Sequence, residues 1–375
     1  MMRILLIARH YPPAVSGGAR RPYLLARELR ALGHEIFVIA PALPEGEPGV
    51  VAPHANRDPA TLSGDAADGM RDVLREWLLW PDPDIRWSMR AATAAAEAAP
   101  WTPDWIWTTS PPESIHSAGL ALKRKTGARW LADFRDHWLD RPHRLARSAP
   151  HRKIGESLVA RFQIPRADLI TCVDGFVADE MRGFGARDPR VLPHFSPPDM
   201  ATPVALPAED VNLVHSGSIS LSDPEADIEA LLAPFEEALR VNPRLRLHFV
   251  GRLTDAEGAR ARASPAGDRI VLHGVRSLPE SLGMQHAADA LALIGSPKTR
   301  VPPSKIVEYL ATTKPIVVCG EGGWLKDERL RGALTPVDIA RLEKGGTGQR
   351  PVLPPTARQA AETLAVWLNE PPARY

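Results

Sequence analysis

The chain has 375 residues, of which 44% are hydrophobic and 24% are charged. This is the composition of a globular protein, and the length exceeds what one hydrophobic core usually organises, so we expect two domains. The 46 basic and 45 acidic side chains give a net charge of +1, which argues against a protein built to neutralise a nucleic-acid backbone. Cys172 and Cys319 are the only cysteines, and no Cys/His cluster has zinc-ligand spacing. A disulfide scaffold and a metal site are therefore not expected, and a reducing cytoplasm fits best.

The first predicted element is a buried strand at residues 3–8, because this apolar run is too short for a signal-peptide core and is closed by charges. After a loop rich in Pro and Gly, apolar residues with helical spacing lead to Gly33, which ends a helix. A second apolar strand follows at residues 35–40. Residues 3–40 therefore form a strand–helix–strand unit with parallel strands.

Strands and helices continue to alternate through the first half of the chain. A helix at residues 112–125 is ended by Gly127. This alternation is typical of a doubly wound α/β domain, which we expect over residues 1–196. The further strands predicted in this half lie at residues 105–109, 130–133, 168–173 and 190–194.

A proline-rich stretch at residues 197–210 has the composition of a stiff inter-domain linker. A second α/β series follows over residues 211–375, so the fold class expected is two Rossmann-like doubly wound domains facing a central cleft. A last helix at residues 356–369 can pack on either half. No apolar run is long enough to span a bilayer, so membrane contact would be peripheral. The second series has predicted strands at 211–215, 245–250, 270–273, 290–294 and 315–319, and helices at 224–239, 279–286 and 304–312.

The loop at residues 10–21 is the first candidate site, since ligands of open parallel sheets bind beyond the carboxyl ends of the strands. It places Gly17 and Gly18 at a helix N-terminus, where glycine lets the backbone approach a ligand and the helix dipole favours an anion. Arg20 adds positive charge. The same residues equally suit an ordinary strand-to-helix turn with solvated arginines, and neither the dinucleotide nor the Walker A glycine spacing is present.

A second candidate loop, residues 133–138, follows a predicted strand and carries Asp133, Arg135 and Asp136. These charges either pair with one another as a local ion network or orient sugar hydroxyls and a phosphate. The position just past a strand end favours the functional interpretation.

The third candidate is the start of the predicted helix at 304–312. Ser304 is a natural N-cap, and Lys305 adds a positive charge to the first turn, where the helix dipole disfavours it. A cation placed where the helix dipole disfavours it indicates an anionic ligand. Glu308 lies one turn further on and could accept hydrogen bonds from vicinal hydroxyls, although acidic residues near helix starts are common.

Four segments together resemble the family-4-type glycosyltransferases of GT-B fold, in the order typical of that family. They are Pro-Pro-Ala-Val-Ser-Gly-Gly at 12–18, Asp-Phe-Arg-Asp-His-Trp at 133–138, Ala-Asp-Leu-Ile-Thr-Cys-Val at 167–173 and Pro-Ser-Lys-Ile-Val-Glu-Tyr-Leu at 303–310. Within the family, the chain is similar to a branch found in bacterial polysaccharide and glycoconjugate gene sets.

The resemblance implies transfer of a sugar from a nucleotide-diphosphate donor to a glycan, lipid-linked or small-molecule acceptor. It further implies retention at the anomeric carbon, no bound metal and no cofactor besides the donor. The C-terminal half would hold the donor. The residues assigned to the donor and substrate are Gly17, Gly18, Arg20, Ser216, Gly217, Ser218, Arg252, Ser304, Lys305 and Glu308, and those assigned to catalysis are Asp133, Arg135 and Asp136.

Two departures from the family pattern leave rival functions open. Many relatives have two glutamates with seven residues between them, but Arg300 stands where the first would be, and Ser218 follows Gly217 where a cation is usual. Arg252, Lys298, Arg300 and Lys305 are the available replacements. The rivals are a catalytically silent sugar-nucleotide-binding partner of another transferase and a GT-B nucleotide-sugar epimerase.

The acceptor is suggested by charge distribution. Residues 123–166 contain twelve basic and four acidic side chains, and eight of the ten tryptophans lie in the same half of the chain. Basic and aromatic residues together suit an anionic, lipid-linked acceptor at the inner face of a membrane. On that interpretation, changing Arg144, Arg147 and Arg152 to Glu weakens liposome binding. The alternative is that the tryptophans are core residues and the charges are solvated.

Overall fold

The structure is a computed structural model, and it forms two compact units. The N-terminal unit comprises Met1–His194 together with Ala357–Tyr375, and the C-terminal unit comprises Phe195–Thr356. The residues expected to form a linker, 197–210, thus belong to the C-terminal unit. The structure describes residues 1–14, 17–53, 79–139, 150–197, 200–297, 303, 305–326, 338–348 and 353–371.

The N-terminal unit contains a seven-stranded sheet in the order β3-β2-β1-β4-β5-β6-β7. All of its strand pairs are parallel, so every carboxyl end lies at the same edge. The inner strands are buried along most of their length because helices cover both faces of such a sheet. The strands are β1 (Arg3–Ala8), β2 (Glu35–Ala40), β3 (Gly49–Val51), β4 (Trp105–Ser110), β5 (Arg129–Phe134), β6 (Leu169–Cys172) and β7 (Pro189–Val191).

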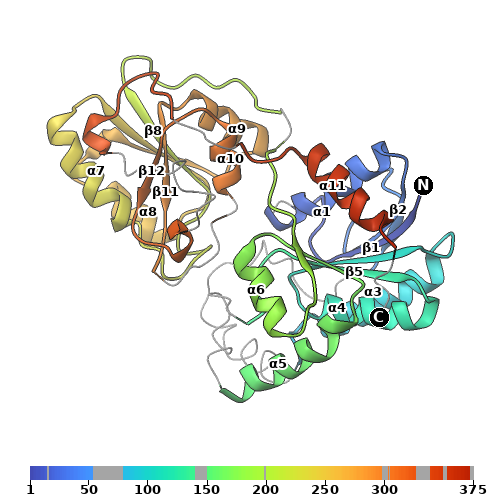
Figure 1. Ribbon diagram of the computed structural model, residues 1–375. Coiled ribbons are helices and arrows are strands. Elements are labelled where there is room, and N and C mark those ends of the chain that lie inside the picture. The colour runs from blue at the N-terminus through green and yellow to red at the C-terminus, as the bar shows by residue number, and fades with distance from the viewer. Residues whose placement is uncertain are drawn as a thin grey trace. The chain divides into compact units, whose positions relative to one another are not determined.

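The helices of this unit include one from the far end of the chain. Figure 1 shows α11 beside α1, and the two helices are in contact. The backbone carbonyl of Leu368 accepts a hydrogen bond from the indole of Trp105 on β4, at 3.2 Å. The helices are α1 (Gly17–Ala31), α3 (Ile85–Ala98), α4 (Ile115–Thr126), α5 (Pro150–Gln163), α6 (Gly175–Gly183) and α11 (Ala357–Asn369).

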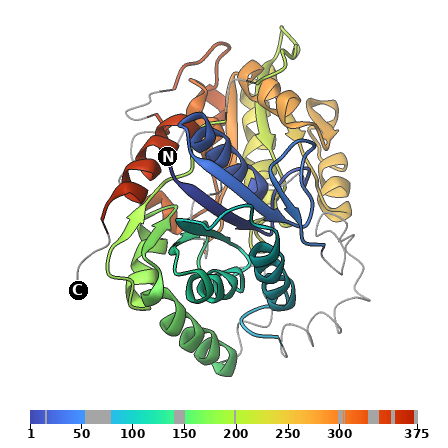
Figure 2. The ribbon, with the colours of Figure 1, turned by 90° about the vertical axis from the view of Figure 1, so that its right-hand side faces the viewer.

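The C-terminal unit has a five-stranded parallel sheet in the order β10-β9-β8-β11-β12. Its strands and helices occupy the yellow-to-red part of the ribbon, while those of the N-terminal sheet run from blue to green (Figures 1 and 2). Its strands are β8 (Val211–Ser216), β9 (Leu245–Val250), β10 (Ile270–Gly274), β11 (Ala290–Ile294) and β12 (Ile316–Cys319), and its helices are α7 (Glu229–Val241), α8 (Asp255–Arg262), α9 (Leu278–Ala287) and α10 (Lys305–Ala311).

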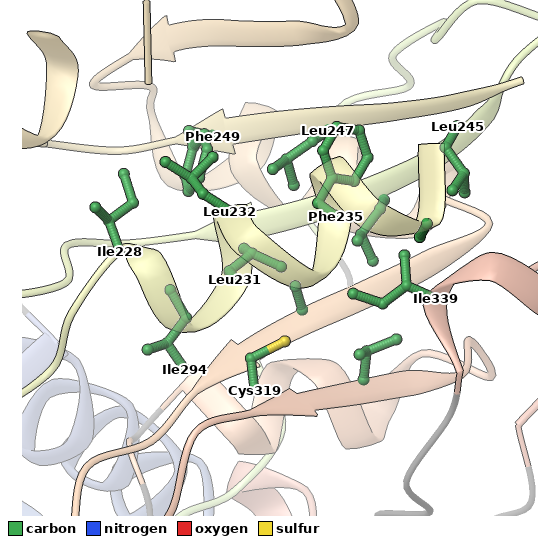
Figure 3. Close-up of a cluster of buried hydrophobic side chains, with 14 of the residues drawn as sticks. Ile228, Leu231, Leu232, Phe235, Leu245, Leu247, Phe249, Ile294, Cys319 and Ile339 are labelled. Atoms are coloured by element: carbon green, nitrogen blue, oxygen red, sulfur yellow. The ribbon is translucent and has the colours of Figure 1, made fainter. Parts of the chain in front are cut away.

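Two apolar clusters cover the two faces of the C-terminal sheet. On one face, Leu231 and Phe235 of α7 pack over Leu247 and Phe249 of β9 (Figure 3). Successive strand residues such as Leu213 and Val214 belong to opposite clusters, because successive side chains of a strand point to opposite faces of the sheet. The second cluster holds α10 against the sheet and so fixes the position of its first residue, Lys305.

The expected fold class is confirmed as two parallel α/β sheets with interleaved helices, while several element ends differ. Helix α4 begins at Ile115 rather than 112, because the backbone N–H and Oγ of Ser114 both donate to the buried carboxylate of Asp82, at 2.7 Å each, and hold a turn there. Helix α7 begins at Glu229 because the side chain of Asp227 caps the Glu229 amide. Strand β3 was not predicted. Among the described residues, no helix is long and apolar enough to cross a membrane.

Candidate functional site

A glycine stands at the carboxyl end of every strand in the C-terminal sheet. These ends form one edge because the strands are parallel. We call it the carboxyl edge of the C-terminal sheet. At Gly251, Gly295 and Gly320 a Cβ would lie within 3 Å of a neighbouring backbone carbonyl oxygen, so these glycines let adjacent turns pack closely together. The five residues are Gly217, Gly251, Gly274, Gly295 and Gly320.

Lys305 lies at this edge and has neutral partners. Its ammonium donates to the backbone carbonyl of Ser218 and to Nε2 of His215, both at 3.3 Å. Among the described residues, no carboxylate forms an ion pair with it. Desolvation lowers the pKa of Lys305 to about 8, and the charge of Glu308 opposes this shift. Within the described ranges, the site therefore holds a cation that no carboxylate contacts directly.

His215 is a part of this arrangement that the sequence analysis missed. It is 1% exposed on β8, and Nδ1 lies 3.0 Å from the carbonyl oxygen of Ala292. A carbonyl can only accept, so Nδ1 carries the proton and Nε2 presents its lone pair to Lys305. Burial and the neighbouring Lys305 keep the pKa of His215 well below its usual value. A signal was available in the sequence, since a histidine near the end of a buried strand is unusual.

The turn after β8 requires glycine. Gly217 has a φ of +93°, and a Cβ there would lie 3.2 Å from Nζ of Lys305. A Cβ on Gly251, whose φ is +139°, would lie 2.7 Å from the carbonyl oxygen of Gly217. The exposed Arg252 follows directly, so this predicted cation lies in the loop next to Gly217.

In the turn of Ser216, Gly217 and Ser218, which was assigned to the donor, two backbone amides are already hydrogen-bonded within the protein. The N–H of Ser216 donates to the hydroxyl of Tyr309 at 2.8 Å, and the N–H of Gly217 donates to the carbonyl of Val250 at 2.7 Å. Both groups already have acceptors, so a diphosphate would not find them available. The turn contributes space and the carbonyl of Ser218, which holds Lys305.

A hydrogen bond from Gln285 of α9 orients Glu308. The amide of this fully buried side chain donates to Oε2 of Glu308 at 2.9 Å and to Oγ of Ser216 at 3.1 Å. Ser216, Lys305 and Glu308 are thus brought together. Ser304 lies outside the described residues, as do Lys298 and Arg300, so the structure gives no account of these three predictions.

Asp133, predicted to be catalytic, is the centre of a buried network in the N-terminal unit. Its oxygens accept from Nε and Nη2 of Arg21, at 3.3 and 3.1 Å, and from the hydroxyls of Thr109 and Thr171, at 2.8 Å each. The three adjacent strands place Thr109, Asp133 and Thr171 in register. Burial raises the pKa of Asp133, but Arg21 and the two hydroxyls outweigh it and hold the pKa below its usual range. The ion partner is Arg21, which the predicted local network did not include.

Arg135 joins the first turn of α1 to the carboxyl end of β4 through backbone carbonyls. Its guanidinium donates to Ser110 at 2.8 Å, to Pro111 at 3.3 Å and to Gly18. A Cβ on Gly18 would lie 2.8 Å from this guanidinium, so Gly18 makes room for Arg135. Arg135 is 7% exposed. Gly17 begins α1, and Arg20 is partly exposed one turn further on.

The rest of this loop is tied to α6. Glu180 accepts from Nδ1 of His137 at 2.8 Å and from the backbone N–H groups of Trp138 and Leu139, both at 3.0 Å. Burial lowers the pKa of His137, but the bond to Glu180 outweighs this and raises it above its ordinary value. Asp136 accepts from the N–H of His137 at 3.0 Å.

One cation that was assigned to the predicted membrane face at residues 123–166 is a core residue instead. Arg152 is 1% exposed and forms an ion pair with the fully buried Glu156, at 2.7 Å, so it cannot face a membrane. Arg144 and Arg147 lie outside the described residues. Five of the eight tryptophans are core residues, as in the alternative considered above. They are Trp87, Trp105, Trp107, Trp130 and Trp138.

Comparisons with known proteins show the fold and a match to one family model. The sequence model of Glycosyltransferase Family 4 matches residues 15–199. No curated protein sequence matches the chain.

Three solved structures share the fold at low sequence identity. AviGT4, a glycosyltransferase involved in avilamycin A biosynthesis, is 15% identical with a TM-score of 0.57, over 98% of this chain and 97% of that one. S. aureus MnaA in a structure with UDP is 12% identical with a TM-score of 0.54, over 99% and 88%. A candidate UDP-N-acetylglucosamine 2-epimerase from Listeria monocytogenes is 12% identical with a TM-score of 0.52, over 97% and 94%.

Proposed function

We propose that this chain, which belongs to the family-4-type glycosyltransferases with the GT-B fold, moves a sugar from a nucleotide-diphosphate donor to a glycan, lipid-linked or small-molecule acceptor. The transfer retains the configuration at the anomeric carbon and uses no metal ion. The donor binds at the carboxyl edge of the C-terminal sheet.

The observation that carries the proposal is the state of Lys305. It is a cation held at this edge by the carbonyl of Ser218 and by neutral His215, with a side-chain-free turn at Gly217 beside it. An isolated charge in a partly buried site is costly unless a partner of opposite charge completes it. A diphosphate is such a partner, and Arg252 in the neighbouring loop supplies a second cation.

The chemistry follows from where charge develops. When the bond between the sugar and the phosphate breaks, negative charge accumulates on the leaving diphosphate. Donors that are already aimed at this charge stabilise it, by about 3–4 kcal/mol for a well-placed group. Lys305 is fixed by two acceptors and needs little rearrangement to act in this way. Glu308, oriented by Gln285, would accept hydrogen bonds from the ribose hydroxyls.

The proposal is tested by thermal unfolding in the presence of UDP, GDP, dTDP and CMP sugars. A ligand at a hundred times its dissociation constant stabilises a fold by about 2.7 kcal/mol. We expect one nucleotide series to raise the melting temperature, and Lys305→Ala and Glu308→Ala each to abolish the shift. Lys344→Ala is the matched control, because Lys344 donates to the backbone of Asp210, away from the carboxyl edge. A normal shift in both site variants would refute the donor site.

The two rival functions are separated by product analysis with the responding donor. An epimerase converts the nucleotide sugar without an acceptor, and a silent partner binds it without turnover. A transferase releases nucleotide slowly by hydrolysis and faster once a suitable acceptor is added. Retention is read from the anomeric configuration of the product, and the metal requirement from activity in a chelator.

A further inference from the structure

Helix α5 carries an exposed apolar stripe on its outer face. Ile154, Leu158 and Phe162 are 63%, 64% and 47% exposed, and they recur every four residues. Residues four apart on a helix lie one above the other on one face. The chain therefore exposes three large apolar side chains in one row, on a helix at the periphery of the N-terminal unit (Figures 1 and 2).

The opposite face of α5 fixes this orientation. A Cβ on Gly155 would lie 1.3 Å from the ring of Trp80, so the helix packs directly on that indole. Arg152 donates to the backbone carbonyl of Pro81 at 2.9 Å, and Gln163 donates to the hydroxyl of Ser117 at 2.7 Å. These contacts hold the inner face, so the apolar stripe points away from the unit.

The charges of α5 are segregated by sign. Its only acidic residue, Glu156, is 0% exposed and pairs with the buried Arg152. Lys153 and Arg161 are exposed beside the apolar stripe. The outer face of α5 thus combines apolar side chains with cations and presents no carboxylate of its own helix.

Two further arginines extend this positive charge at the C-terminal end of the stripe. The guanidinium groups of Arg166 and Arg124 lie 4.0 and 5.6 Å from the ring centre of Phe162. Both residues also line a cavity of about 620 Å³ at the amino ends of β5 and β6. Six cations and three carboxylates line this cavity, which gives it an excess of positive charge.

We propose that the outer face of α5 docks on a bilayer that contains anionic phospholipid. Ile154, Leu158 and Phe162 enter the boundary between headgroups and acyl chains, and the flanking cations contact the negatively charged headgroups. An apolar face flanked only by cations is the pattern of helices that lie in a membrane interface. The charge complementarity selects an anionic surface, and this inference does not depend on the nucleotide site.

Co-sedimentation of the whole chain with vesicles tests the docking face. We expect binding to vesicles of phosphatidylcholine mixed with phosphatidylglycerol, weaker binding to pure phosphatidylcholine, and a loss of binding at high salt, since exposed charges are screened. Leu158→Ser and Phe162→Ser should each lower the partition coefficient by roughly tenfold. Val366→Ser on α11 is the matched control, because this side chain is 62% exposed in the same unit but lies outside the stripe.

A charge-reversal pair tests the cations separately. Lys153→Glu with Arg161→Glu should reduce binding to the anionic vesicles by roughly tenfold or more. Arg182→Glu, an exposed arginine on α6 that pairs with Asp179, should leave it unchanged. The proposal is overturned if the chain binds neither vesicle, if the controls lose binding equally, or if pure phosphatidylcholine binds equally well. It is also overturned if light scattering shows a dimer that Leu158→Ser dissociates, because the stripe would then be an interface between copies.

Discussion

Asp133 in the N-terminal unit and Lys305 in the C-terminal unit are both charged residues at the carboxyl end of a parallel sheet, yet their surroundings differ. Asp133 is 1% exposed, and Arg21 and two threonine hydroxyls match its charge and its hydrogen-bonding capacity. Lys305 is partly exposed and is held by a carbonyl and a neutral imidazole.

The difference separates a structural charge from one available to a ligand. A buried charge with all its partners inside the protein stabilises the packing of the elements that carry those partners, here α1 and three strands. A charge such as that of Lys305, which is held in place by neutral groups, can still form an ion pair with a bound ligand of opposite charge. Both residues lie at the carboxyl edge of a parallel sheet, so that position alone does not distinguish the two cases.

The largest effect should come from breaking the Asp133 network. Asp133→Asn leaves the 2% exposed guanidinium of Arg21 without its counter-charge, so we expect the free energy of unfolding to fall by about 3–5 kcal/mol. Urea unfolding measures this change. Asp179→Asn, which removes an exposed ion pair with Arg182, should change it by about 0–1 kcal/mol. If both variants changed the free energy of unfolding by a similarly small amount, Asp133 would not be a structural charge.

Lys305→Met should weaken nucleotide binding and leave the stability of the fold nearly unchanged. Removing a cation with neutral partners costs the fold little, whereas the diphosphate loses a charged hydrogen-bond donor, which we expect to weaken nucleotide binding by about 1.5–3 kcal/mol. Calorimetric titration with the responsive nucleotide measures the loss of affinity. Urea unfolding of the same variant measures the change in stability. A variant that unfolds easily and binds normally would mean that Lys305 is structural.

Gly217→Ala tests the space beside Lys305. A φ of +93° costs a non-glycine residue about 1–2 kcal/mol, and the new methyl group would also press on the ammonium of Lys305. Gly345→Ala provides the control, since its φ is +70° with nothing near the added carbon. Both variants should lose similar stability, but nucleotide affinity should fall only in Gly217→Ala. Equal affinities would argue against a ligand at this turn.

The smallest expected effect is the pH dependence of Lys305. Its pKa of about 8 in the folded state is below the value of 10.5 for an unburied lysine. Between these values the unfolded chain binds more protons, so the stability of the wild type should rise with pH relative to Lys305→Met. Nucleotide affinity should fall as pH rises above about 8, because the cation is lost. Parallel curves for the two proteins would show that Lys305 does not titrate in this range.

Most of the fold was predictable, and the candidate site was partly so. Alternating apolar strands and helices gave both sheets, since this pattern arises from local residue order. Lys305 was found because it is a cation at a helix start, where the helix dipole disfavours it, and His215 could have been found as a titratable residue near the end of β8. Gln285 could not, because its contact with Glu308 joins α9 to α10 across 23 positions in the chain.

The amino-acid sequence by itself determined the two α/β units, the order of their elements and the glycines that end the strands of the C-terminal sheet. These features depend on burial patterns and backbone freedom within short stretches. Only the tertiary structure decided that Asp133 is matched by Arg21, that Arg152 faces inward, that α11 returns to α1, and that α5 exposes an apolar row between cations. Such outcomes depend on which side chains meet across distant segments, and a linear pattern does not carry that information.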